Sequence, residues 1–382
     1  MNLNFIRSKN SILKADMVGS HILEICGSEA GTVNRAYDFE PEKNTITEIA
    51  PEIKKYKFIS VRNCIYGIDK FYFASYSEIE EKVRVAVYEY DFEANTAKSI
   101  FEFYSDKILT DGSNRVKIFI LNQTKFLVQV ETLIHDENRT LMGAISFDLT
   151  LYDSESGGFS PVDVADFKNN GINEIIPVSE SMIMVKCGYS YIEDKRFEML
   201  SEKEALIESI YLTNSAQLIA DIMLNQSTGN MKLIDTAYFD KCITTPKVKD
   251  GFIFYEIIDL INYISDISFV NINTLEKIIY RKENTDDKKQ ISPVVISNVP
   301  YIKTSGRNSE RFLNLSDGLE DMEFTDESFL CSCGSAMFFE KKRRGRTMLR
   351  IYSYPRINFL YEEQYSLKTV CSKDDEYYIY IE

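Results

Sequence analysis

The phrase YDFEPEKNT at residues 37–45 returns as YDFEANT at residues 90–96, about fifty residues further along the chain. In both copies aromatic residues precede a polar run that ends in Asn and Thr. Asp, Asn and Thr close tight turns because their side chains hydrogen-bond to nearby backbone groups. Apolar and polar residues alternate around each phrase, which is typical of the two strands of a hairpin. We therefore interpret the phrase as a hairpin turn, with a calcium site built from its Asp residues as the alternative.

Hairpins of the same kind recur through the whole chain. Six copies are visible, at residues 34–50, 86–103, 145–162, 208–222, 267–280 and 349–366. One strand-like run precedes each hairpin and another often comes before that, so the unit has about four strands. The period is roughly 50–60 residues, with one longer interval before the last copy. A single small sheet cannot cover both of its faces, and stacking such sheets covers them. The chain therefore resembles a β-propeller, an all-β architecture of four-stranded blades.

Strand-like runs at both ends of the chain predict how the propeller closes. The runs are MNLNFIRS at residues 1–8 and DDEYYIYIE at residues 374–382. We expect them to pair in one shared blade that closes the ring. Six hairpins and this shared blade give seven blades, whereas termini that only complete the first blade give six. The prediction is a single propeller domain over residues 1–382, with an irregular, charged loop insertion at about 303–327.

One segment contains a signal for a helix. Residues 201–225 open with Ser201-x-x-Glu204, the pattern of a helix capping box. Strands are nevertheless expected here, because residues 208–222 fall at the period of the other hairpins. A short helical turn at 201–206 is compatible with either interpretation.

The resemblance is to an architecture, and no motif-bearing propeller family matches. The Trp-Asp dipeptide of WD repeats is absent, because the chain contains no Trp. Gly157-Gly158 stands alone in a turn without the spaced aromatic residues of kelch repeats, and the sialidase Asp-box has no match. No family's functional residues are therefore transferred to this chain.

Charge and composition exclude several classes of partner. The 382 residues carry a net charge of −15, with an isoelectric point near 4.9. Such a chain repels nucleic acid and anionic lipid, so neither is expected as a partner. No apolar run reaches the roughly 20 residues of a membrane span, and the N-terminus lacks the pattern of a signal peptide. Seven scattered cysteines then predict reduced thiols in a cytoplasmic protein, which we expect to be a monomer.

A dense basic stretch interrupts this acidic chain. The segment EKKRRGRTMLR at 340–350 holds five cations, which are Lys341, Lys342, Arg343, Arg344 and Arg346. The strand-like runs on either side predict an exposed hairpin end with a glycine near its tip. Such a turn can bind an acidic partner or a phosphate through charge-assisted hydrogen bonds, or it can be a solvated turn that neutralises acidic neighbours.

Other groups that can carry chemistry are few. Cys331 and Cys333 share one face of a strand, but a metal site needs further ligands, so neither a metal nor a cofactor is expected. His21 and His135 are the only histidines, and a catalytic triad would have to use one of them. Among 59 acidic residues no catalytic pair can be singled out.

These observations favour a non-catalytic role. We expect a scaffold that binds a protein or peptide partner through loops on one propeller face, with the basic turn and residues 303–327 contributing. The alternative is an enzyme of the glycoside hydrolase or lyase type that uses carboxylates in the central channel. An enzyme requires a cluster of polar side chains where the innermost strands converge, and that requirement distinguishes the two hypotheses.

Overall fold

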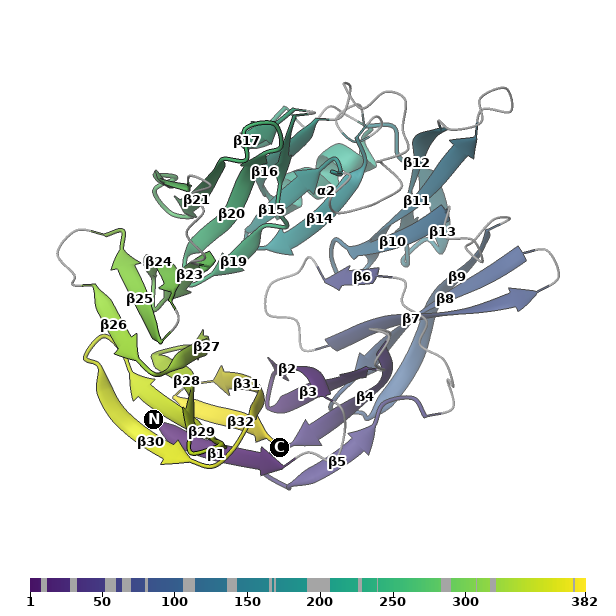
Figure 1. Cartoon of the computed structure of the whole chain (residues 1–382). Helices are drawn as coiled ribbons and strands as arrows, with labels where there is room; N and C mark the ends of the chain where they lie inside the picture. Colours follow the sequence, from purple (N-terminus) through teal and green to yellow (C-terminus); the bar gives the residue numbers. More distant parts are fainter. Residues whose placement is uncertain are drawn as a thin grey trace. The chain divides into compact units, whose positions relative to one another are not determined.

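The computed structural model of the chain is almost entirely β-structure, as the alternating pattern predicts (Figure 1). It describes residues 1–7, 12–27, 33–51, 60–63, 70–79, 82–105, 114–135, 143–164, 167, 170–190, 207–225, 229–238, 240–282, 290–306, 308–316, 321–373 and 375–382. Contacts divide the chain into two compact units. Unit 1 comprises residues 1–27 and 246–382, and unit 2 comprises residues 28–245.

Unit 1 is built from strands that come from both ends of the chain. Its strands are β1 (Asn2–Arg7), β2 (Ile12–Val18), β3 (His21–Gly27), β19 (Lys247–Lys249), β20 (Phe252–Asp259), β21 (Ser265–Asn271), β22 (Lys277–Lys282), β23 (Gln290–Ile296), β24 (Val299–Ser305), β25 (Ser309–Asn314), β26 (Met322–Thr325), β27 (Ser328–Cys333), β28 (Ala336–Arg343), β29 (Arg346–Ser353), β30 (Asn358–Glu363), β31 (Leu367–Lys373) and β32 (Glu376–Ile381). Strands β23–β26 form one four-stranded antiparallel sheet in sequence order, and β27–β30 form another. This consecutive order is that of a propeller blade.

Unit 2 continues the same pattern. Its elements are β4 (Val33–Glu40), β5 (Thr45–Glu48), β6 (Ser60–Asn63), β7 (Lys70–Ile79), β8 (Lys82–Asp91), β9 (Thr96–Ser105), β10 (Asn114–Ile120), β11 (Lys125–His135), β12 (Gly143–Asp153), β13 (Gly158–Pro161), β14 (Ile172–Pro177), β15 (Met182–Cys187), β16 (Glu208–Asn214), α2 (Ser215–Met223), β17 (Lys232–Ala237) and β18 (Lys241–Ile243). The sheet β14–β17 again has four strands in sequence order, whereas β6 joins the sheet β10–β13 by pairing in parallel with β10.

The fold is a β-propeller with eight blades among the described residues, so the expectation of seven or six blades is wrong. The missed blade is β23–β26, whose outer strands β25 and β26 lie within the expected loop insertion at 303–327. In β25 two positions depart from the usual pattern, because Glu310 is buried beside Phe312, whereas Leu313 is exposed. The Glu310 carboxylate accepts hydrogen bonds from the Phe329 backbone N–H at 2.7 Å and the Ser305 hydroxyl at 3.1 Å. These two hydrogen bonds stabilise the carboxylate in its buried position. Strands β25 and β26 thus lie within the stretch where the loop insertion is expected.

The two terminal strands pair as the sequence predicts. Residues 2–7 of β1 run parallel to residues 376–381 of β32, and β31 completes this three-stranded sheet. The shared blade is therefore confirmed, while closure of a ring by that blade stays a prediction.

The repeated phrase is a hairpin turn in both copies. It connects β4 to β5 and β8 to β9. In the second copy the Asp91 carboxylate accepts the backbone N–H groups of Glu93 and Ala94, both at 3.0 Å. The two copies also touch, because the Tyr90 hydroxyl donates to the Asp38 carboxylate at 3.5 Å. The phrase thus closes a hairpin and packs one blade on the next, as a structural repeat does.

The segment after β16 is a helix, which corrects the expectation of strands over 208–222. Helix α2 begins after Asn214, whose side chain accepts the backbone N–H groups of Ala216 and Gln217 at 3.0 and 3.2 Å. This N-cap replaces the hairpin turn expected here, and the outer strand of the blade is supplied by β17 instead. The expected helical turn at 201–206 lies outside the described residues. No helix in the described part of the chain is long and apolar enough to cross a membrane.

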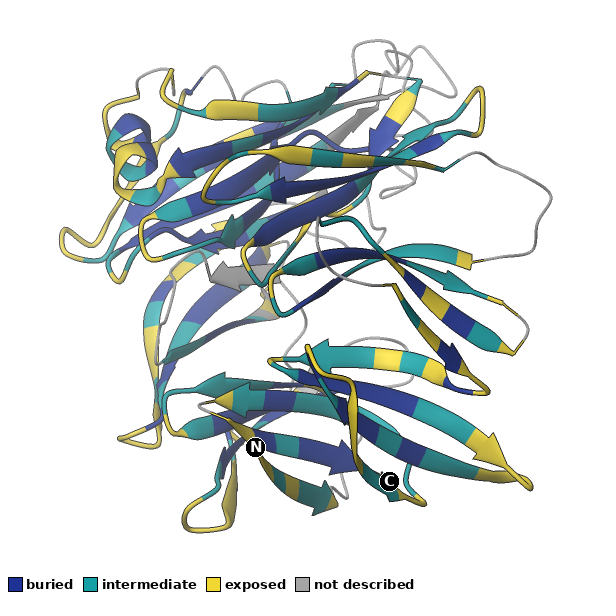
Figure 2. Cartoon of the chain, turned by 90° about the vertical axis from the view of Figure 1, so that its left-hand side faces the viewer, coloured by how far each residue is buried: buried dark blue, intermediate teal, exposed yellow. Residues whose placement is uncertain are grey.

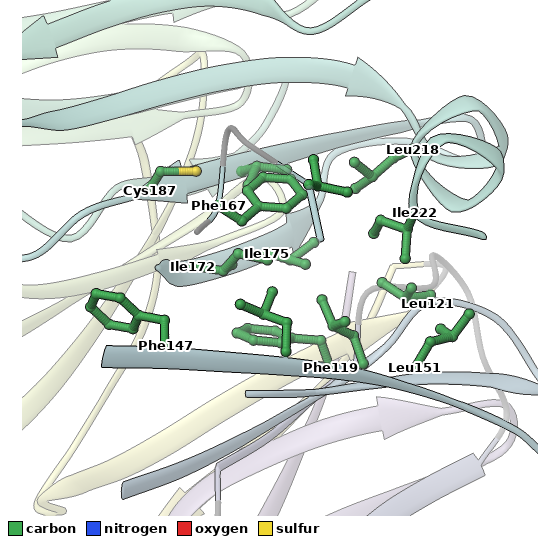
Figure 3. Close-up of a cluster of buried hydrophobic side chains, with 14 of the residues drawn as sticks. Phe119, Leu121, Phe147, Leu151, Phe167, Ile172, Ile175, Cys187, Leu218 and Ile222 are labelled. Atoms are coloured by element: carbon green, nitrogen blue, oxygen red, sulfur yellow. The ribbon is translucent and has the colours of Figure 1, made fainter. Parts of the chain in front are cut away.

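Blades pack on one another through buried apolar faces (Figure 2). In unit 2, Phe119 and Leu151 of one blade meet Ile175 of the next, and Leu218 and Ile222 of α2 extend the same cluster (Figure 3). The two α2 residues are four positions apart and therefore lie on one face of the helix. Burying each of these side chains contributes roughly 2 kcal/mol to folding, so the inter-blade layers are the main source of stability.

Candidate active site

The first strands of successive blades meet in unit 1. Strands β23, β27, β31 and β2 contact one another in this order, and each is followed by a tight turn into the second strand of its blade. Neighbouring turns are hydrogen-bonded. The Asp250 carboxylate, in the turn after β19, accepts the Ser297 backbone N–H at 3.1 Å, and the Ser297 hydroxyl donates to the Gly334 carbonyl at 3.2 Å. Polar side chains therefore gather where the inner strands of this unit converge.

Lys249 and Ser332 form the central contact of this region. Lys249 ends β19, and its Nζ donates to the Ser332 backbone carbonyl at 2.9 Å and also to the Ser332 hydroxyl. The same hydroxyl donates to the Val295 carbonyl of β23 at 3.2 Å. Three inner strands are thus joined by one amine and one hydroxyl, and both side chains remain half-buried rather than sealed from solvent.

Burial gives Lys249 an unusual proton affinity. Desolvation lowers its pKa below the ordinary value of 10.5, because the charged ammonium loses hydration. The neighbouring Asp250 carboxylate opposes this effect, and it does so incompletely. Burial also raises the pKa of Asp250, against the opposing influence of the Lys249 charge and the Ser297 N–H. A lysine with a lowered pKa can act as a general base.

The cysteines beside this pair are poor nucleophiles. Burial raises the pKa of the Cys331 thiol to about 11, and it raises the pKa of Cys333 as well. Since the thiolate is the reactive form, these thiols are protonated and weakly reactive at neutral pH. Cys333 Sγ lies 3.0 Å from the Ser372 hydroxyl. The two cysteines do occupy one strand, β27, as the sequence predicts, and they shape the site around Ser332 rather than react in it.

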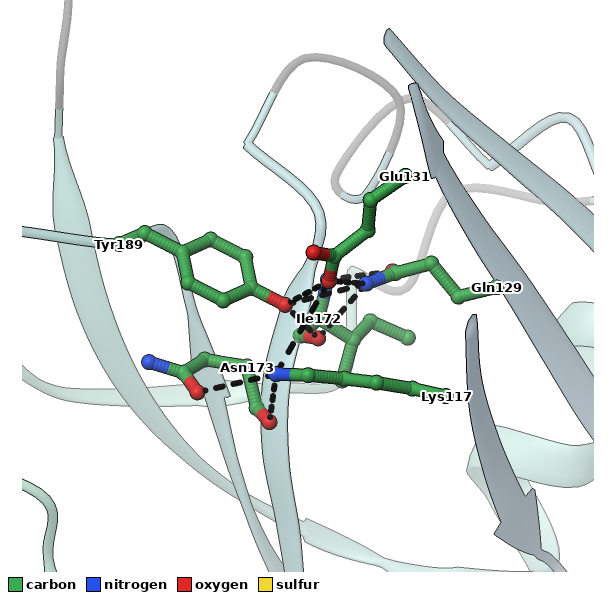
Figure 4. A network of polar contacts seen from close by, with 6 residues as sticks. All are labelled: Lys117, Gln129, Glu131, Ile172, Asn173 and Tyr189. Atoms are coloured by element: carbon green, nitrogen blue, oxygen red, sulfur yellow. Dashed lines mark hydrogen bonds and ion pairs between the residues drawn. The ribbon is translucent and has the colours of Figure 1, made fainter. Parts of the chain in front are cut away.

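A second polar cluster, in unit 2, is structural (Figure 4). The Gln129 amide both donates to the Ile172 carbonyl at 2.9 Å and accepts the Ile172 N–H at 2.7 Å, so it imitates a strand pair between two blades. The Tyr189 hydroxyl donates to the Glu131 carboxylate, which lies 3.9 Å from Lys117 Nζ. Gln129 and Glu131 are completely buried. A substrate cannot reach these satisfied groups, and we assign them to holding β11 against β14.

The residues predicted from the sequence lie apart from Lys249 and Ser332. The five cations occupy the end of the β28–β29 hairpin, with Gly345 in its turn, as expected. His21 opens β3 and His135 ends β11. The sequence analysis missed Lys249 and Ser332, because one lies in a charged hairpin end and the other lies between two cysteines. The Asp250-Gly251 dipeptide is a signal for a tight hairpin turn, and it marks the end of the strand that carries Lys249.

Comparisons with known proteins agree on the fold. No family model and no curated protein sequence matches the chain. Porphyromonas gingivalis dipeptidyl peptidase 4 is similar with a TM-score of 0.50 at 10% identity, over 92% of this chain and 52% of that one. The β-propeller domain of the Trilobed protease from Pyrococcus furiosus has a TM-score of 0.44 at 10% identity, over 94% and 96% of the two chains. An oligogalacturonate lyase, solved in complex with manganese, has a TM-score of 0.43 at 11% identity, over 91% and 90%.

The expectation of a non-catalytic scaffold, and of a chain that is not an enzyme, is contradicted. Dipeptidyl peptidase 4, which shares the propeller, is a peptidase by name. Polar side chains also gather at the inner strands of unit 1, as the enzyme alternative requires. At such low identity the likeness itself establishes the fold. The chain spans about half the length of the dipeptidyl peptidase 4 chain that it matches.

Proposed function

We propose that this chain is a hydrolase in which Ser332 is the nucleophile and Lys249 is the general base. The observation that carries the proposal is the hydrogen bond between Lys249 Nζ and the Ser332 hydroxyl, formed by an amine whose pKa burial lowers. A serine hydroxyl is a weak nucleophile until an adjacent base accepts its proton, and a lysine with a lowered pKa serves as that base in Ser–Lys hydrolytic sites. The substrate class is a carboxylic ester or amide.

The reaction follows from the positions of these two groups. When Lys249 is neutral, the Ser332 hydroxyl can turn its proton from the Val295 carbonyl to Lys249 Nζ. Lys249 then accepts this proton as the oxygen attacks the substrate carbonyl, and the resulting ammonium gives the proton to the leaving group. Lys249 next deprotonates a water molecule, which attacks the acyl-serine. The bond from the acyl carbon to the Ser332 oxygen breaks, the acid leaves, and the Lys249 ammonium returns its proton to the Ser332 oxygen. In an antiparallel strand the N–H and C=O groups of one residue point to the same side. The Ser332 N–H therefore points to the side of Lys249, where it can donate to the developing oxyanion.

A lyase reaction is the second candidate, favoured by Asp250. Its carboxyl group has a raised pKa and follows Lys249 directly in the chain, so a base and an acid stand side by side. Removal of a proton next to a carbonyl followed by loss of a leaving group needs such a pair, and it does not need Ser332.

Labelling by a fluorophosphonate probe at pH 9 tests the first candidate. We expect the probe to attach to Ser332, as read by peptide mass spectrometry, and p-nitrophenyl ester hydrolysis to fall by about a hundredfold in Ser332→Ala and in Lys249→Met. The matched control is Ser372→Ala, because Ser372 is a half-buried serine on the neighbouring inner strand β31. Absence of both labelling and hydrolysis would contradict the hydrolase, whereas elimination activity that survives Ser332→Ala would favour the lyase.

A further inference from the structure

The end of the β28–β29 hairpin projects beyond both neighbouring strands. Pairing of β27 with β28 stops at Glu340, and pairing of β29 with β30 stops at Leu349. Residues 341–348, which we name the basic finger, pair only with each other. Their outer backbone edges have no strand beside them among the described sheets. The finger is therefore a two-stranded projection beyond the neighbouring strands of its sheet.

The finger concentrates positive charge at a cost to its own stability. Arg343 and Arg346 lie directly opposite each other in the ladder, and like charges in that position are destabilising. Arg344 and Gly345 form the turn, with φ of 50° and 78°. The first of these positions strongly favours Asn, Asp or Gly, so an arginine there is unfavourable. The stability of the fold therefore does not explain why arginines occupy these positions.

Acidic residues neutralise the base of the finger and leave its tip charged. Lys341 Nζ lies 3.7 Å from the Glu327 carboxylate, and Lys342 Nζ lies 3.9 Å from Glu340. Arg343, Arg344 and Arg346 are exposed and form no ion pair within the described residues, although the chain has 59 acidic side chains. Three guanidinium groups thus remain available for an external anion.

We propose that the basic finger binds an extended Asp- or Glu-rich polypeptide segment. Guanidinium groups bind carboxylates with two parallel hydrogen bonds, and a segment with several carboxylates can engage all three arginines. The unpaired strand edges of the finger allow the same segment to add as a further strand, which supplies main-chain hydrogen bonds. Nucleic acid and anionic membranes present much larger anionic surfaces, which the net charge of −15 repels. This binding goes beyond the proposed hydrolysis and does not depend on it.

Fluorescence anisotropy with a labelled Glu-rich peptide of about twelve residues tests the proposal, a length that spans a strand and its flanks. We expect binding that weakens as salt rises, and no binding of a Gln-for-Glu version of the peptide. Charge reversal of Arg343, Arg344 and Arg346 to Glu should weaken binding by at least about tenfold. The ester hydrolysis of this triple variant should remain unchanged, because the substitutions lie outside the Lys249 and Ser332 pair.

A charge-matched control separates local binding from overall electrostatics. Changing Lys98, Lys232 and Lys241 to Glu alters the net charge by the same amount at exposed positions of unit 2, and should leave most of the binding intact. Equal loss in both variants would overturn the proposal, as would failure of the native protein to bind the peptide. Preferential binding of a poly-dT oligonucleotide or of phosphatidylserine vesicles through the same arginines would also overturn it, in favour of those partners.

Discussion

At the scale of single residues, the properties of the candidate site come from partial burial of charged groups. Burial lowers the pKa of Lys249, and the nearby Asp250 charge only partly opposes this, while Lys249 still donates two hydrogen bonds to Ser332. The same contacts would also be made by a lysine that only fastens β19 to β27. A substitution that keeps the cation but removes the base separates these two roles.

Lys249→Arg is that substitution. Arginine keeps the positive charge and the donors that can reach Ser332, but its pKa is too high for it to accept a proton near neutral pH. We expect ester hydrolysis to fall by about a hundredfold while the melting temperature changes by only a few degrees. In the native protein, hydrolysis should increase as the pH rises through the lowered pKa of Lys249, because the neutral amine is the active form. A variant that keeps its activity and loses stability would instead assign Lys249 to structure.

Glu24 gives a second prediction at this scale, for stability. It is 1% exposed, burial raises its pKa above the ordinary value of 4.5, and its Oε2 has no hydrogen-bond partner among the described residues. The unfolded chain loses the Glu24 proton near pH 4.5, whereas the folded protein keeps it to higher pH. Between these values the folded state binds more protons, so raising the pH lowers the free energy of unfolding.

Glu24→Gln removes this titration and keeps the side-chain shape. Urea unfolding of both proteins from pH 4 to pH 8 should therefore show the variant gaining stability relative to the native protein as the pH rises above about 4.5. The Tyr380 hydroxyl, which donates to Glu24 at 2.9 Å, can donate equally to the amide oxygen. If the free energies of unfolding of the two proteins differed by a constant amount from pH 4 to pH 8, the pKa of Glu24 would be the same in the folded and unfolded states.

At the scale of elements, local signals explain where strands stop and where the exceptional helix starts. The N-cap of α2 depends on one side chain, Asn214, which accepts two backbone N–H groups. Asn214→Ala leaves those donors without their partner and should destabilise the protein by about 1 kcal/mol. Thermal unfolding measures this, and Asn214→Asp should restore most of the loss. An unchanged melting temperature for the alanine variant would mean that packing of Leu218 and Ile222 alone determines the helix.

Arg344 adds positive charge to the turn of the basic finger but lowers the stability of that turn. Arg344→Asn places a preferred residue at φ of 50° and removes one of three neighbouring charges. We expect stability to rise by about 0.5–1 kcal/mol and affinity for the Glu-rich peptide to fall several-fold. Calorimetry and anisotropy on one preparation measure both quantities. A variant that gains stability without losing affinity would remove Arg344 from the binding surface.

The elements that the sequence predicted correctly are those with a regular pattern and a local turn signal. The hairpin after Asp91 and the pairing of β1 with β32 follow from alternation and from turn residues. The blade β23–β26 was missed because β25 buries the acidic Glu310 and exposes the apolar Leu313, so its sequence does not alternate as a strand face normally does. The contact of Lys249 with Ser332 joins residues 83 positions apart, and no local pattern encodes such a pairing.

At the scale of the whole molecule, the chain connectivity makes unit 1 depend on both ends of the sequence. Residues 1–27 join residues 246–382, and unit 2 is the continuous stretch between them. The candidate site is therefore carried by the discontinuous unit, with Lys249 and Ser332 both in its C-terminal part. Weakening the pairing of β1 with β32 should therefore destabilise unit 1 more than unit 2.

Phe5→Pro tests this dependence. Phe5 lies opposite Ile379 in the parallel pair, and its ring centroid is 4.7 Å from that of Tyr361 and 6.0 Å from that of Tyr365. Proline removes the backbone N–H, breaks the extended pairing and deletes the ring, at a cost of about 3 kcal/mol or more. Hydrogen exchange read by mass spectrometry should show faster exchange in peptides from 12–27 and 246–382, with little change in peptides from unit 2. Phe5→Tyr, which keeps the ring and the N–H, is the control and should exchange like the native protein. Equal acceleration in both units would mean that they unfold together, and the two groups of residues would then be one cooperative structure.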